Sequence, residues 1–207
     1  MAIQSMTLLE AVNEIVETVG EFTMTGPVAD GSGTSIYDRA RQFLDREDRR
    51  IQSQGWPENT VMGKAITASG AGAIGVSEGI TNNTLRVRAS GNSAHRTLVI
   101  RESGGTQVLY DANADTPTFQ NNEVVYLDIV TKLDFADLPP LLQDVVVAKA
   151  KMEFQRRIQG NPQHDQALYQ EYIQAEVALD RNRPDTVQPF NVQPMIPGGG
   201  GSQKKEG

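Results

Sequence analysis

The sequence predicts an α+β fold: a four-helix bundle, an inserted antiparallel β domain shaped as a small sandwich or barrel, and an extended C-terminal arm. Apolar residues recur at helical spacing near both ends of the chain, alternate with polar residues in the middle, and give way to prolines and glycines at the C-terminus. We expect residues 1–58 and 133–181 to form the bundle, residues 59–132 the insertion and residues 182–207 the arm.

Two helices are expected before the insertion. Thr7 and Glu10 form a capping-box pair, in which each side chain bonds the backbone of the other residue, so the first helix is expected over residues 7–19. A second helix is expected over residues 35–54. One of its faces is apolar, and the opposite face carries charges of mixed sign that can pair along the surface.

The middle of the chain alternates apolar and polar residues, as a half-buried strand does. Two alternating segments, residues 96–101 and 106–110, flank Gly104-Gly105, a pair typical of tight hairpin turns. Residues 123–131 predict another strand, with Val125, Leu127 and Ile129 on one side. We expect four to six strands in total.

Two further helices are expected after the insertion. Asp137 is a natural N-cap, and Pro139 and Pro140 suit a first turn, where few amide donors are needed. This helix should end before Gly160, and Asn161-Pro162 should begin the next one. Because the link is short, the two helices should run antiparallel.

The arm combines helix-breaking prolines with apolar residues spaced along an extended segment. Such a segment suits docking into a groove on a partner. The alternative is a linker or an expression remnant, an interpretation that we favour for the glycine-rich end after Pro197. The candidate docking residues are Val187, Phe190, Val192, Met195 and Ile196.

Composition restricts the function classes. The net charge is −7, which argues against a protein that grips nucleic acid through phosphate contacts, although an acidic surface could let DNA slide past without sticking. The chain has no cysteine, so neither a disulfide framework nor a thiolate metal site is expected, and assembly in a reducing cytoplasm fits. We expect no targeting segment and no membrane span.

Two glycine-rich motifs look catalytic but lack their context. Residues 70–75 match the dinucleotide-binding fingerprint and residues 75–79 match a hydrolase nucleophile elbow, yet no helix is expected after either motif. A serine hydrolase that uses Ser77 with His164 stays as an alternative. His95 and His164 belong to no ligand cluster, so we expect no catalytic, cofactor-binding or metal site.

Five other side chains are candidate contacts. Trp56 follows a helix end and is expected to plug the core between the helical and β parts, or else to anchor a subunit contact. Four arginines, Arg86, Arg88, Arg96 and Arg101, form a local basic patch. We interpret the patch as a solvated strand face, with a channel-lining or partner-facing role and nucleic-acid binding as the alternatives.

Two blocks of sequence resemble the tail tubular protein A family of podoviruses. The first comprises residues 9–21, which end in Val-Gly-Glu, and residues 50–56, which end in Gln-Ser-Gln-Gly-Trp. The second begins with Asp137-Leu138-Pro139 and ends with Phe-Gln-Arg-Arg-Ile-Gln-Gly over residues 154–160. The chain departs from the family pattern after Trp56 and in its glycine-rich run.

The resemblance implies a non-enzymatic virion protein, the head-to-tail adaptor. Family members form a twelve-subunit ring between the portal protein and the nozzle protein, tail tubular protein B, around the channel through which DNA leaves. The arm would pack on the portal, and tail fibres would be further neighbours. The location would be the neck and tail of the virion, after assembly in the host cytoplasm. A head-completion or stopper protein of a long-tailed phage is the alternative.

Overall fold

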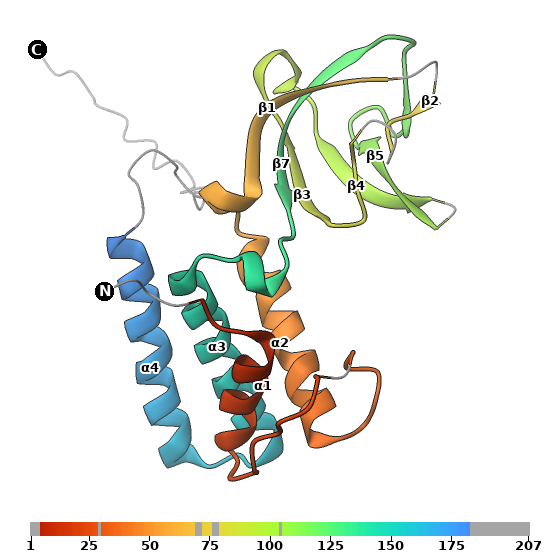
Figure 1. The fold of residues 1–207 in the computed structure, drawn as a ribbon. Coiled ribbons are helices and arrows are strands. Elements are labelled where there is room, and N and C mark those ends of the chain that lie inside the picture. The colour runs from red at the N-terminus through yellow and green to blue at the C-terminus, as the bar shows by residue number, and fades with distance from the viewer. Residues whose placement is uncertain (1–4, 29, 69–71, 76–78, 104, 183–207) are drawn as a thin grey trace, which may run out of the picture.

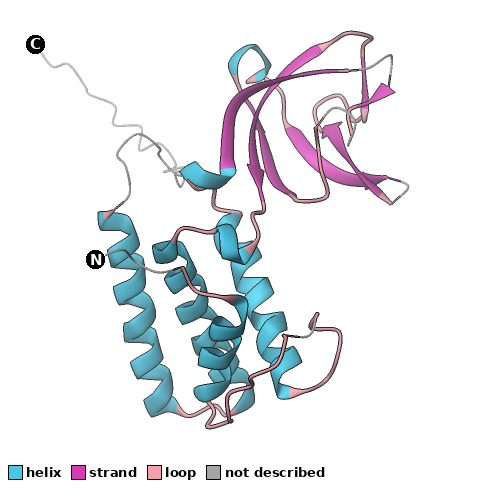
Figure 2. Ribbon diagram, in the orientation of Figure 1, coloured by secondary structure: helices cyan, strands magenta, loops and turns pink. Residues whose placement is uncertain are grey.

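The protein has a helical part and a β part that lie end to end (Figures 1 and 2). The computed structural model describes residues 5–28, 30–68, 72–75, 79–103 and 105–182. The chain enters the β part after its second helix and returns to the helical part after the last strand. The predicted α+β class is confirmed.

Four helices form the helical part: α1 (Leu8–Glu17), α2 (Ile36–Gln52), α3 (Pro140–Ile158) and α4 (Pro162–Arg181). The predicted capping box of α1 is present, because the Glu10 amide donates to Thr7 Oγ1 and the Thr7 amide donates to Glu10 Oε2. Asn161 caps α4 by accepting from the amides of Gln163 and His164, as its position predicts.

The prediction that Asp137 caps α3 is wrong. Asp137 ends a short 3₁₀ turn, Phe135–Asp137, and α3 begins at Pro140 after the N-cap residue Pro139, whose side chain makes no cap. Pro140 has no amide hydrogen and its φ is already suited to a helix, so this start leaves one donor fewer to satisfy.

Helix α3 is central to the helical part. It contacts α1, α2 and α4, and it is buried on almost every side, so its sequence lacks a single apolar face. Helices α1 and α2 bury their apolar faces against it, whereas α4 has no fully buried residue and rests on α3 through partly buried Tyr172, Ala175 and Leu179.

Seven strands occur among the described residues, which is more than the four to six predicted. Two of them are only two residues long, too short to show an alternating pattern in the sequence. Three antiparallel sheets result: β1 (Thr60–Thr67), β7 (Val124–Thr131) and β3 (Thr84–Ala89) in the order β1-β7-β3; β4 (Leu98–Ser103) with β5 (Thr106–Asp111); and β2 (Gly72–Ala73) with β6 (Thr118–Phe119).

Strand β7 lies at the centre of the β part. Val125, Leu127 and Ile129 enter the β core, as their alternation predicts, and the expected hairpin across Gly105 is also confirmed. The hydrophobic core of the β part shares no residue with that of the helical part. This separation supports our proposal that residues 1–58 with 133–181, and residues 59–132, are two domains.

Gln52 joins the two parts at the point where the chain crosses between them twice. Its amide nitrogen donates to the Leu133 carbonyl oxygen (3.0 Å), and its oxygen accepts from the Leu133 amide (2.7 Å). The Gln52 carbonyl oxygen accepts from Asn59 Nδ2 (3.0 Å), so one residue holds both the outgoing and the returning segment. Its side chain is completely buried.

An ion pair reinforces the same crossing. Asp48 lies one turn before Gln52 on α2 and accepts from Gln52 Nε2 (2.7 Å). Its other carboxylate oxygen lies 2.9 Å from Lys132 Nζ, next to Leu133 in the returning segment. Asp48 is 1% exposed, so this charge depends on Lys132 and on Gln52 for its compensation.

Replacing Gln52 with alanine should therefore weaken the whole fold. Gln52→Ala removes four hydrogen bonds, which join its side chain to Asp48, Asn59 and both backbone groups of Leu133, so we expect a loss of about 2–3 kcal/mol in unfolding free energy. Chemical denaturation followed by circular dichroism measures it. The exposed neighbour Gln54→Ala is the matched control and should change little, and equal stability of the two variants would contradict this role.

Candidate partner-binding surfaces

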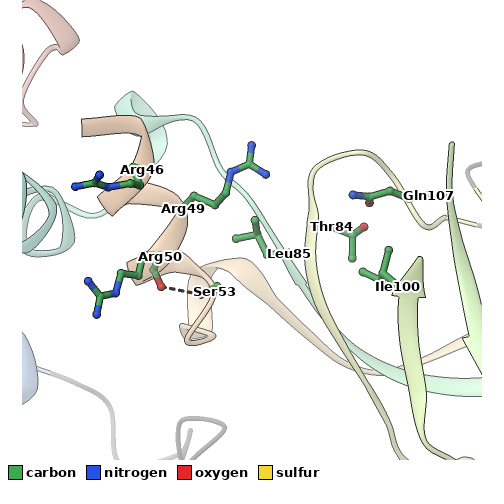
Figure 3. Close-up of a pocket in the computed structure, with 8 residues that line it drawn as sticks. All are labelled: Arg46, Arg49, Arg50, Ser53, Thr84, Leu85, Ile100 and Gln107. Carbon is green, nitrogen blue, oxygen red and sulfur yellow. Dashed lines mark hydrogen bonds between the residues drawn. The ribbon is translucent and has the colours of Figure 1, made fainter. Parts of the chain in front are cut away.

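A basic cleft of about 480 Å³ lies between the C-terminal half of α2 and the β part (Figure 3). Its helical wall carries Arg46, Arg49 and Arg50. Arg46 and Arg50 lie one helical turn apart and share a face, whereas Arg49 is adjacent to Arg50 and points in another direction. In Figure 3 the Arg49 side chain extends toward the β part, whereas those of Arg46 and Arg50 extend to the other side of α2. The remaining lining residues are Ser53, Thr84, Leu85, Ile100 and Gln107.

The arginines of the basic cleft are only partly compensated. Buried Glu47 accepts from Arg46 Nε (3.1 Å) and lies 3.5 Å from Arg50 Nη1. Arg46 also stacks over the Phe43 ring at 4.4 Å from its centroid. Arg49 is exposed, and within the described ranges its side chain forms neither an ion pair nor a hydrogen bond. Arg49 is therefore the charge that this helix presents toward the β part (Figure 3).

An acidic groove of about 170 Å³ lies on another side of the helical part, between α1, α3 and α4. Glu14, Asp144 and Glu171 supply one carboxylate from each helix. Lys151 lies between two of them, with its Nζ 2.5 Å from Glu171 Oε1 and 3.6 Å from Glu14 Oε2. Asp144 has no ion-pair partner in the part of the chain that the structure describes, so the groove keeps a surplus of two negative charges.

Burial affects the carboxylates of the acidic groove. It raises the pKa of Asp144 above the ordinary value. It also raises the pKa of Glu14, an effect that Lys151 opposes and that Glu171 and Asp144 reinforce. The two carboxylates would therefore gain from an additional cation.

The two surfaces could be predicted from the sequence to different extents. The sequence predicts that the mixed charges of α2 pair along its own surface. That interpretation holds for Arg41 with Asp45 and does not hold for Arg49. The acidic groove has no local signal, because its three carboxylates come from three helices.

The four arginines expected to form a patch in the β part make contacts within the chain. Arg88 pairs with buried Asp128 (2.8 Å) and Arg96 with Glu123 (2.5 Å), while the Arg101 guanidinium stacks over the Tyr110 ring at 3.6 Å. Arg86 is half-buried and lies opposite Val130 of β7. These contacts within the chain give the arginines a role in holding the strands together.

Trp56 lies in the hydrophobic core of the helical part rather than in that of the β part. It is 7% exposed, its indole N–H donates to the Ile51 carbonyl oxygen (2.9 Å), and its amide donates to Asn59 Oδ1 (2.8 Å). These bonds secure the first segment that leaves α2. A pocket of about 40 Å³ opens between Trp56, Leu179 and Asn182, the last described residue.

The five apolar residues of the arm, Val187, Phe190, Val192, Met195 and Ile196, lie outside the described residues. The same is true of Ser77 and of part of the dinucleotide-like motif. The residues that follow these motifs in the described chain lead into β3, whereas either motif would require a helix.

The described neighbours of Ser77 lie far from His164. Gly75 and Gly79, which flank Ser77, belong to the β part, while exposed His164 lies in the first turn of α4. Helix α3 runs 19 residues away from the junction before α4 begins, a distance of about 28 Å. Exposed His95 lies in a turn of the β part.

The described residues contain no group of three or more histidine, cysteine, aspartate or glutamate side chains that could hold a metal ion. None of their helices is long and apolar enough to cross a membrane. The features that stand out in the described chain are two open hollows on separate sides of the molecule, one with Arg49 in its wall and one lined by carboxylates.

A family model described as tail tubular protein matches residues 9–189. Since the match covers most of the chain, the protein belongs to the tail tubular protein family, and it is a structural component of a phage tail. The suspected resemblance is thus confirmed. No curated protein matches the chain.

Among solved structures, the chain is similar to one described as the neck of an empty GTA particle computed with C6 symmetry. The two share 15% sequence identity over 83% of this chain and 95% of that chain. The TM-score of 0.26 is too low to establish a shared arrangement of elements.

The Arg88–Asp128 contact gives a test of pH dependence. Burial alone would raise the pKa of Asp128, but the hydrogen bond from the Gly63 amide and those from Arg88 and Ser90 lower it below the ordinary value of 3.8. Because the pKa of Asp128 is lower in the folded state, its ionised form stabilises the protein at pH values above the ordinary pKa. This stabilisation is lost as the pH falls through the folded-state pKa.

The unfolding free energy of the wild type should therefore decrease as the pH is lowered from about 5 to about 2.5. The decrease should be smaller for Asp128→Asn. Urea denaturation across this range measures the difference. Asp134→Asn, at an exposed position next to the junction, is the matched control. Parallel pH profiles for wild type and Asp128→Asn would contradict the assignment.

Proposed function

We propose that this protein is the head-to-tail adaptor of a podovirus, one of about twelve subunits in a ring between the portal protein and the tail nozzle. The ring would surround part of the channel through which DNA is ejected. The observation that carries the proposal is the family match over residues 9–189, combined with two unlike charged hollows on one chain.

A ring needs contacts between unlike surfaces, because each subunit meets its two neighbours through different faces. The basic cleft and the acidic groove are two such surfaces. The net charge of −7, repeated around the ring, would reduce adhesion of passing DNA. No described residue combination supports an enzymatic role, and we propose that the function is geometric.

The arm is proposed to bind the portal. It follows α4, whose last residues lie beside the small pocket at Trp56, near the junction of the two parts. The β part, at the other end of the molecule from the α3–α4 link, is then free to meet the nozzle protein or the tail fibres (Figure 1). Assembly would take place in the host cytoplasm, which fits a chain without cysteine.

The native mass of the purified chain, alone and mixed with its portal ring, tests the function. We expect a complex of fixed stoichiometry with about twelve chains per portal ring. A chain that stays a monomer and ignores the portal at every concentration would contradict the adaptor role.

Truncation tests the arm. Deleting residues 183–207 should leave the circular dichroism spectrum of the helices intact and abolish binding to the portal ring, and Phe190→Ala should weaken binding about tenfold, as loss of a buried aromatic anchor does. Deleting only residues 198–207 is the matched control and should preserve binding. Portal affinity that survives the longer deletion would rule out the arm as the docking element.

A further inference from the structure

We propose that neighbouring copies of this chain join through Arg49 of the basic cleft on one copy and the carboxylates of the acidic groove on the next. The inference rests on the proposed function and specifies it further, because it assigns the subunit contact to two named surfaces. The occupant of each hollow is thus a second copy of the same chain.

The two surfaces lie on separate sides of the molecule. The basic cleft is lined by α2 and by the β part, with no residue from α1, α3 or α4, and the acidic groove is lined by α1, α3 and α4, with none from α2. Helices α2 and α4 flank the central α3 (Figure 1). A copy can therefore use both surfaces at once, and a chain of such contacts can close into a ring.

The charges of the two surfaces are complementary. Arg49 extends toward the β wall of the basic cleft, whereas Arg46 and Arg50 extend to the other side of α2, where they contact Glu47 (Figure 3). The acidic groove has a surplus of two negative charges after Lys151 is counted. Each also contains one charge without an ionic partner in the described chain, Arg49 in the cleft and Asp144 in the groove. A planar guanidinium binds a carboxylate through two parallel hydrogen bonds, so this pair can form a directed contact.

The partial desolvation of the carboxylates in the acidic groove favours the approach of a cation. Partial desolvation raises the pKa of Asp144. The charged groups that act on Glu14 are Lys151 and Asp144 from α3 and Glu171 from α4. One lysine does not balance three carboxylates. An incoming arginine would stabilise their ionised forms at neutral pH.

Phosphate groups of DNA could in principle occupy the basic cleft instead. The observations favour a second copy, because the chain as a whole has a net charge of −7 and carries the complementary groove itself. DNA binding is kept as an outcome of the test.

Charge exchange tests the contact. Arg49→Glu and Asp144→Arg should each lower the association constant between copies by about tenfold or more, because each places like charges opposite one another. An equimolar mixture of the two variants should assemble again, since every contact in an alternating ring then pairs opposite charges. The double variant R49E/D144R should assemble alone for the same reason.

The measurement is sedimentation velocity at low salt, on the full chain alone and on the chain bound to its portal ring. Arg39→Glu, an exposed position of α2 outside the basic cleft, and Asp180→Arg, in the last turn of α4, are the matched controls and should assemble as wild type does. Circular dichroism establishes that each variant is folded. Recovery in the mixture excludes misfolding as the cause of the single-variant defects.

The inference is overturned if either single reversal assembles as well as wild type, or if the mixture fails to recover. It is also overturned if Arg49→Glu assembles normally but loses affinity for a DNA duplex, which would assign the cleft to nucleic acid. In both cases the adaptor function stands as long as the chain still binds the portal ring. Failure of wild type to bind itself and the portal ring overturns the function and the inference together.

Discussion

The arrangement of this protein depends on the hydrogen bonds that Gln52 makes at the crossing between its two parts. The chain passes this point twice, and the buried Gln52 side chain bonds both backbone groups of Leu133 while its carbonyl oxygen accepts from Asn59. The Asp48–Lys132 ion pair lies beside it. Because these groups are buried, breaking them without replacement is unfavourable, and the β part is held in one position relative to α2.

The fixed junction shapes the basic cleft. Arg49 lies three residues before Gln52 on α2, and the opposite wall of the cleft consists of residues from β3, β4 and β5. A junction that bent freely would vary the distance between these walls. A ring of identical subunits requires the same contact at every position. A rigid crossing meets this requirement because it keeps the geometry of the cleft the same in every subunit. The acidic groove, formed by three packed helices, is similarly fixed.

Much of the fold could be predicted from local signals in the sequence. These signals involve residues close together in the chain: the Thr7–Glu10 capping box, the Asn161 cap, the alternation along β7 and the turn of the β4–β5 hairpin. The two shortest strands could not be predicted, because they depend on pairing with distant segments. The start of α3 could not be predicted either, because Pro140 lacks an amide hydrogen and begins the helix without a side-chain cap. The candidate surfaces could not be predicted from local signals. Only packing shows that Arg49 has no ion-pair partner among the described residues, and that Glu14, Asp144 and Glu171 line one groove.

The most direct test of the account is an electron cryo-microscopy map of the protein assembled on its portal ring. We predict a closed ring in which α2 of each copy faces the groove between α1, α3 and α4 of the next, with density joining Arg49 to Asp144. A ring whose copies meet through other surfaces, with both hollows open to solvent, would contradict the proposed contact. Chains bound singly to the portal, without touching one another, would contradict the ring itself.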